Sequence, residues 1–166
     1  YGNGSWIYLT YNLIGHSYDG VSWSKTTGMN GLPILQNWST GAYGNGKWVV
    51  IAKGPGSGGM TASNAAMYST VPSLATDWTL SPSGLPGLIG WVGMTYGNDL
   101  FVAVADGSVT DPTGYQVISS PDGISWSWVS NAKTLTEGWA DVAFGAGTFV
   151  AVANNESDLS QAVMYS

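Results

Sequence analysis

Charged side chains are scarce in this sequence. Only 8% of the 166 residues are charged, whereas soluble domains average about a quarter, and all four basic residues are lysines. The formal net charge is −6 at pH 7. Binding to nucleic acid or to an anionic membrane surface requires a basic patch that neutralises phosphates. We therefore expect neither partner for this chain.

Cysteine is absent, and no apolar run is long enough to cross a membrane as a helix. Disulfide bonds and thiolate metal sites are therefore excluded, and we expect no membrane insertion. No basic segment followed by an apolar one opens the chain, as it would in a secretory signal. The first residue, Tyr1, stands in the middle of a repeat, so we expect a mature or excised part of a longer chain.

Glycine and aromatic residues are abundant instead, and they recur in a fixed pattern. An aromatic residue, a glycine-rich turn and a second aromatic residue five positions after the first occur at 1–6, 43–48, 96–101 and 144–149. Turns of the Asn-Gly kind between apolar segments predict β-hairpins. We therefore divide the chain into units at 1–37, 38–90, 91–138 and 139–166, and we expect them to form a single domain over residues 1–166.

A second motif, Ser-x-Asp-Gly-x-x-Trp, occurs at 17–23 and at 120–126. Aspartate accepts hydrogen bonds from nearby backbone N–H groups and glycine adopts positive φ, so the motif predicts a tight turn between two strands. The residues expected to form these structural turns are Ser17, Asp19, Gly20, Trp23, Ser120, Asp122, Gly123 and Trp126. Because eight of the nine tryptophans fall on repeat positions, we interpret them as core residues rather than as sugar-stacking residues.

Each complete unit is expected to contain four antiparallel strands. The predicted strands are 6–10, 13–17 and 23–25 in the first unit, 38–43, 48–53, 65–69 and 78–80 in the second, 91–96, 101–106, 115–119 and 126–130 in the third, and 139–144, 149–154 and 162–166 in the fourth.

The stretches 48–52, 101–105 and 149–153 are apolar at successive positions, which indicates strands buried on both faces. A β-sandwich would give alternation instead. The predicted fold is therefore all-β, a β-propeller of four-stranded antiparallel blades, with about 3.5 blades present. We expect other chain segments or neighbouring subunits to complete the ring.

The two Ser-x-Asp-Gly-x-x-Trp motifs resemble shortened Asp-boxes of sialidase-type (BNR-like) propeller repeats. Together with the aromatic-Gly-Asn-Gly-x-aromatic pattern, they are similar to repeats of phage and other virion tail or surface proteins and of secreted bacterial repeat proteins. The resemblance covers nearly the whole chain. It implies an extracellular or virion-surface location, and it implies that Asp19 and Asp122 form turns away from any active site.

The connections between strands divide into two kinds. The turns between the first and second strands of each unit are short and uniform, whereas the connections from second to third strand, and from one unit to the next, vary in length and content. The variable connections lie together on one side of a propeller and predict a binding surface there. The candidate binding residues are Tyr11, Lys53, Asp106, Asp111, Asn154, Asn155, Glu156 and Asp158. Such side chains suit a neutral polysaccharide, Ca²⁺ or a protein surface, and the alternative is that they are simply solvated.

Catalytic signals are weak. A sialidase needs arginines for the substrate carboxylate, and the chain has none. Asp141 with Glu137 is the best carboxylate pair for a glycoside hydrolase. The single histidine, His16, gives no basis for a triad or a metal cluster.

The sequence as a whole predicts a non-enzymatic binding module that recognises a cell-surface glycan or protein and needs no cofactor. The alternatives are a purely structural assembly protein and a glycoside hydrolase.

Overall fold

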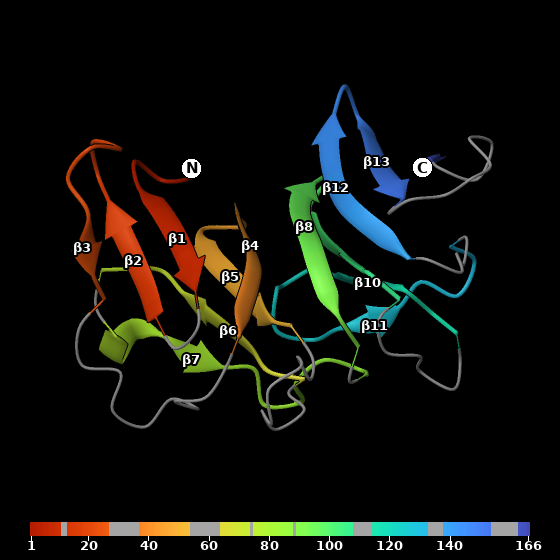
Figure 1. The fold of residues 1–166 in the computed structure, drawn as a ribbon, viewed down its shortest axis with the longest axis horizontal. Coiled ribbons are helices and arrows are strands. Elements are labelled where there is room, and N and C mark those ends of the chain that lie inside the picture. The colour runs from red at the N-terminus through yellow and green to blue at the C-terminus, as the bar shows by residue number, and fades with distance from the viewer. Residues whose placement is uncertain are drawn as a thin grey trace.

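The chain folds into β-strands in a computed structural model. The structure describes residues 1–10, 13–26, 37–53, 64–73, 75–87, 89–107, 114–132, 138–153 and 163–166. Within these ranges, the strands form four antiparallel sheets, and one short 3-10 helix, η1 (Ala75–Asp77), precedes the last strand of the second sheet. Figure 1 shows the sheets following one another in chain order, from the N-terminal sheet at the left to the C-terminal sheet at the upper right.

The two outer sheets have three strands each and the two central sheets have four. The first sheet contains β1 (Trp6–Thr10), β2 (Leu13–Ser17) and β3 (Ser24–Lys25), and the second contains β4 (Trp38–Gly44), β5 (Lys47–Ala52), β6 (Ala66–Ser69) and β7 (Thr79–Leu80). The third contains β8 (Trp91–Gly97), β9 (Leu100–Ala105), β10 (Val117–Ser120) and β11 (Ser127–Trp128), and the fourth contains β12 (Trp139–Gly145), β13 (Thr148–Ala153) and β14 (Val163–Tyr165). Every sheet runs up and down in chain order.

The sheets pack face to face through corresponding strands. The first strand of the second sheet, β4, contacts β8, and β8 contacts β12 (Figure 1). Small antiparallel sheets stacked in this way are β-propeller blades. The chain is therefore an incomplete β-propeller.

The two-residue turns between the first and second strands have the geometry that the sequence predicts. Asn45 and Gly46 have φ values of 47° and 74°, and both Asn98 and Asp99 also have positive φ. Positive φ at both central residues is the mark of the hairpin turn whose twist matches the flanking strands. Each turn brings its two aromatic residues into register across the hairpin, as in the pair Tyr96 and Phe101.

The innermost strands also share an irregularity. The register of β4 against β5 shifts by one residue at Ser39, and β8 and β12 shift at the equivalent residues Val92 and Ala140. A β-bulge at the same place in three units shows that the repeat extends to backbone detail.

Buried side chains form one cluster between each pair of neighbouring sheets. In β5 and β9 every residue after the first is buried, because each strand has a sheet on both sides. The prediction of strands covered on both faces is thus confirmed for the two central sheets.

The prediction of two covered faces is wrong for 149–153 in β13, where only Ala151 is fully buried. Two further details of the sequence prediction are also wrong. The last strands of the first three sheets are shorter than predicted: β3, β7 and β11 have two residues each and begin one residue after the tryptophan that was expected to open them. In addition, Trp6 and Trp23 are not core residues, because 43% and 44% of their surfaces are exposed on the outer side of the first sheet.

Candidate functional site

The two Ser-x-Asp-Gly-x-x-Trp motifs adopt the same hydrogen-bonded turn. In the third sheet, Asp122 Oδ1 accepts bonds from the backbone N–H groups of Ile124 (2.8 Å) and Ser125 (2.7 Å). The Ser120 hydroxyl donates to the same oxygen (2.9 Å) and accepts from the N–H of Gly123 (2.8 Å).

The turn in the first sheet repeats this arrangement, with Asp19 accepting from Val21 and Ser22 at 2.8 and 2.7 Å. Both carboxylates are therefore occupied within their own turns.

The hydrogen bonds also change the acidity of these aspartates. Burial raises the pKa of Asp122, but the backbone N–H groups of Ser125 and Ile124 outweigh it and lower the pKa to about 2. Backbone N–H groups of Ser22 and Val21 hold the pKa of Asp19 well below its usual value. A carboxylate so strongly kept in its charged form is a poor general acid or base near neutral pH.

These turns lie on the side of the sheets that also carries the two-residue hairpin turns, and we call this the turn side. Hydrogen bonds cross it from one sheet to the next. The Lys47 Nζ donates to the carbonyl of Asp122 at 3.1 Å, and the side-chain amide of Asn98 donates to the carbonyl of Gly147 at 3.2 Å. Hydrogen bonds between neighbouring sheets thus hold the turn side together as a scaffold.

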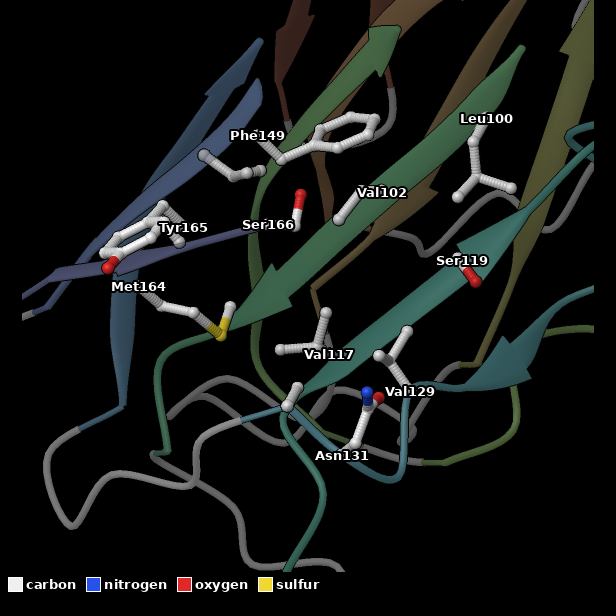
Figure 2. Close-up of a pocket in the computed structure, with 13 residues that line it drawn as sticks. Leu100, Val102, Val117, Ser119, Val129, Asn131, Phe149, Met164, Tyr165 and Ser166 are labelled. Carbon is white, nitrogen blue, oxygen red and sulfur yellow. The ribbon is translucent and has the colours of Figure 1, made fainter. Parts of the chain in front are cut away.

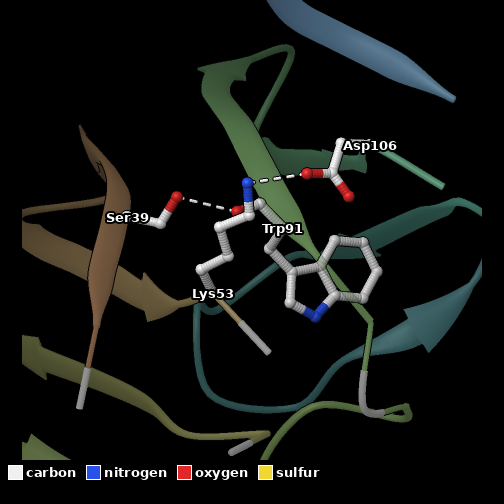
Figure 3. Close-up of polar contacts among 4 residues, drawn as sticks. All are labelled: Ser39, Lys53, Trp91 and Asp106. Atoms are coloured by element: carbon white, nitrogen blue, oxygen red, sulfur yellow. Dashed lines mark hydrogen bonds and ion pairs between the residues drawn. The ribbon is translucent and has the colours of Figure 1, made fainter. Parts of the chain in front are cut away.

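The opposite side carries the connections 11–12, 53–65, 106–116 and 154–162, together with those between units, and we call it the loop side. Here two of the predicted binding residues meet. Lys53, after β5, forms an ion pair of 2.7 Å with Asp106, after β9 (Figure 3). Their side chains are 34% and 12% exposed. The lysine thus offsets the charge of the Asp106 carboxylate at the base of these loops.

The backbone at the base of the loop side is also tightly arranged. Lys53 N–H donates to the carbonyl of Asn37 (2.7 Å), and Asp106 N–H donates to that of Gly90 (2.8 Å). Gly138, with a φ of 74°, packs so closely on the backbone of Asp106 that a Cβ atom there would overlap it. Next to these contacts, the hydroxyl of Ser39 donates to the carbonyl of Trp91 at 2.7 Å (Figure 3). The loops therefore start from a fixed platform.

The other six predicted binding residues lie outside the described residues. They are Tyr11, Asp111, Asn154, Asn155, Glu156 and Asp158, and Glu137 of the predicted carboxylate pair also lies outside. In the part of the chain that the structure describes, no three His, Cys, Asp or Glu side chains come together as a metal site. No helix among the described residues is long and apolar enough to cross a membrane.

Asp141 lies on β12 directly after the bulge and is exposed. Its Oδ1 accepts a hydrogen bond from the adjacent Val142 N–H (2.8 Å), and it lies so close to Gly93 of β8 that a Cβ there would meet it at 2.7 Å. The side chain therefore has a structural contact between the innermost strands.

A cavity of about 440 Å³ lies between the third and fourth sheets, and no sequence pattern predicted it (Figure 2). It is lined mainly by apolar side chains, which include Val102, Val117, Val129, Phe149 and Met164.

At the interface of the second and third sheets, Trp126 packs with its ring centroid 6.5 Å from that of Phe101, the counterpart of Phe149. Between the first and second sheets, Trp78 belongs to the same cluster as Trp48. The described residues of the fourth unit have no counterpart of these two tryptophans, and the cavity lies beside the corresponding aromatic, Phe149.

No protein-family model and no curated protein matches this chain. Solved structures do resemble it. The chain is similar to a structure described as YCF48 bound to D1 peptide, with a TM-score of 0.56 and 14% identity over 89% of this chain. It is similar to virginiamycin B lyase from Staphylococcus aureus, with a TM-score of 0.59 and 18% identity over 84% of the chain. A computationally designed protein, Ika4, gives a TM-score of 0.60 and 9% identity over 99% of the chain.

YCF48 and virginiamycin B lyase are β-propellers, and at these identities they establish the fold alone. This chain spans 42% and 41% of their lengths, and 86% of the length of Ika4.

Proposed function

We propose that this chain is a non-enzymatic binding module of the propeller class, displayed on a virion or outside a cell, whose loop side recognises a glycan. The two aspartate turns would then be Asp-box-like elements of the scaffold, as in BNR-like repeats. No part of the proposed recognition requires a cofactor.

The observation that carries this proposal is the contrast between the two sides of the sheets. On the turn side, two residues join β4 to β5 (45–46), β8 to β9 (98–99) and β12 to β13 (146–147). On the loop side, the connections are 11–12 from β1 to β2, 53–65 from β5 to β6, 106–116 from β9 to β10 and 154–162 from β13 to β14. Long and dissimilar loops on a rigid scaffold are the usual place for binding residues.

The composition of the loops favours a neutral glycan. They are rich in Ser, Thr, Asn and Asp, whose hydroxyl, amide and carboxylate groups form hydrogen bonds with sugar hydroxyls. The chain has no arginine to pair with a sialic acid or sulfate group, and the described lysine of the loop side is engaged by Asp106.

A protein ligand is the second candidate, because one structural neighbour was solved with a peptide bound. That likeness is one of fold, so it supports only the general suitability of a propeller for holding a peptide.

The test is affinity electrophoresis of the chain through gels that contain dextran, mannan or xylan. We expect retardation by at least one polysaccharide. Replacing residues 54–64 or residues 107–114 by a two-residue Asn-Gly turn should abolish the retardation while the protein stays folded.

Val21→Thr is the matched control, since Val21 lies in an exposed turn on the turn side and its replacement should leave the retardation unchanged. If the wild-type chain and all of its variants had the same mobility in every gel, glycan binding by the loop side would be contradicted. If only Val21→Thr abolished the retardation, binding would lie on the turn side and not on the loop side.

A further inference from the structure

The two ends of the stack of sheets both expose apolar side chains. On the outer side of the first sheet, Tyr1 is 71% exposed, beside the half-exposed Trp6 and Trp23. On the outer side of the fourth sheet, Val150 and Val152 are 38% and 43% exposed. Contiguous apolar surface of this kind marks an interface.

The interfaces inside the chain show what covers such surfaces. In each of them, the first aromatic residue of a hairpin lies on a glycine of the preceding sheet. A Cβ atom at Gly2 would overlap the ring of Tyr43, one at Gly44 would overlap Tyr96, and one at Gly97 would overlap Phe144. The same aromatic-on-glycine contact thus occurs three times in succession.

The fourth glycine of this series has no such cover. A Cβ atom at Gly145 would meet nothing within 4 Å, so the slot that an aromatic ring fills in the other sheets is open. At the opposite end of the stack, Tyr1 is the first aromatic of its hairpin. Its ring centroid lies 4.8 Å from that of Trp6, much as Phe144 lies 4.7 Å from Phe149. Tyr1 therefore already holds the arrangement that its counterparts use at the internal interfaces.

A second pair of positions matches in the same way. Gly123, in the aspartate turn of the third sheet, lies so close to Val49 of the second sheet that a Cβ would overlap it. The counterpart of Gly123 is Gly20, in the aspartate turn of the first sheet, and the counterpart of Val49 is the exposed Val150. The outer surface of the first sheet thus carries Tyr1 and Gly20, and that of the fourth sheet carries their counterparts, Gly145 and Val150.

We propose that a second copy of this chain binds head to tail, with the first sheet of one copy on the fourth sheet of the other. Tyr1 then lies on Gly145, and the turn at Gly20 lies on Val150. The occupant is a second copy because this chain carries both halves of the contact and repeats the complete contact three times within itself. Such an interface is heterologous, so it closes into a ring or continues as a filament.

The test measures the mass of the 166-residue chain in solution by sedimentation equilibrium. We expect concentration-dependent multiples of the 17.3 kDa chain mass. Gly145→Val fills the open slot, and Tyr1→Asp places a charge in the apolar contact. Each should weaken self-association roughly 30-fold or more, the effect of losing a central contact.

Mixing the two variants gives the sharpest readout. Each has one blocked end and one intact end, so an equimolar mixture should form a dimer and no larger species. Val71→Asp is the matched control, because it adds the same charge at an exposed position in the turn after β6 and should leave association unchanged.

The fold of every variant is checked by near-ultraviolet circular dichroism of its tryptophans. A folded wild-type chain that stays monomeric at all concentrations would overturn the proposal and leave these surfaces to a different partner. A dimer that survives both single substitutions, or variants that do not combine when mixed, would also overturn it.

Discussion

Strands β9 and β13 contain the same five residues, Phe-Val-Ala-Val-Ala, at 101–105 and 149–153, but they lie in different surroundings. In β9 all five are buried, since the second sheet covers one face and the fourth sheet covers the other. In β13 only Ala151 is fully buried, and the two valines are exposed. Identical sequence thus gives full burial in the central strand and alternation in the outer one.

A continuous apolar strand therefore requires a neighbouring sheet on each face, and its own sequence does not provide them. Burying a valine side chain stabilises a fold by roughly 1.5–3 kcal/mol. Val102 and Val104 make this contribution within the chain, whereas Val150 and Val152 can make it only when something covers the fourth sheet. The first sheet shows the same deficit at Trp6, whose counterpart Trp48 is buried.

A charge introduced at equivalent valines of β9 and β13 should give the largest difference in stability between the two strands. Val104→Asp places an unpaired carboxylate between two sheets, and we expect it to lower the free energy of unfolding by about 3–5 kcal/mol. Val152→Asp exposes the same group to water in a dilute monomer, so we expect a change within about 0.5 kcal/mol. Urea unfolding followed by tryptophan fluorescence measures both values. Similar losses for the two variants would mean that the outer face of β13 is covered in the monomer.

A gentler test uses the alanines at the centre of the two strands. Ala103 lies in the packed cluster between the second and third sheets, so Ala103→Val should overpack it and destabilise the chain by about 1–3 kcal/mol. Ala151 lines the cavity beside Phe149, so Ala151→Val should stabilise the chain by about 0.5–1 kcal/mol. Thermal unfolding of the two variants gives opposite signs if the cavity is open. Destabilisation by both would show that the third and fourth sheets close on each other in solution.

The regular part of this fold follows from local sequence. Asn-Gly turns with an aromatic residue on each side, and the Ser-x-Asp-Gly turns, determine their own geometry through positive φ and short-range hydrogen bonds. The two-residue strands β3, β7 and β11 were less predictable. They exist only through pairing with the preceding strand, so the tryptophan before each one was wrongly included.

The candidate site was predictable only in part. Lys53 and Asp106 stand out as polar residues at the ends of apolar strands, but their ion pair depends on which sheets are neighbours. The cavity beside Phe149 lies where Trp78 and Trp126 fill the equivalent interfaces of the second and third units, and the described part of the fourth unit has no such tryptophan. Long-range packing decides both features, and no local pattern encodes it.

A last comparison concerns the two aspartate turns. The folded pKa of Asp122, about 2, lies below the usual 3.8, so its carboxylate stabilises the fold above pH 4 and this contribution is lost as the pH falls toward 2. Asp122→Asn should therefore lower stability at pH 7 by about 1 kcal/mol, a modest figure because water screens the partly exposed group, and should flatten the acid limb of the stability curve.

Asp19→Asn is the matched variant. The pKa of Asp19 is lowered by the same kind of hydrogen bonds, so its contribution is also lost in acid. The turn at Asp122 additionally accepts the Lys47 ammonium from the second sheet, whereas no described sheet packs against the outer side of the first sheet, where the turn at Asp19 lies. We therefore expect the larger loss for Asp122→Asn in urea titrations between pH 2 and pH 7. Equal curves in the monomer would show that the contact between sheets adds nothing to the turn. In a self-associated sample, equal stability curves of the two variants would mean that another copy of the chain covers the Asp19 turn.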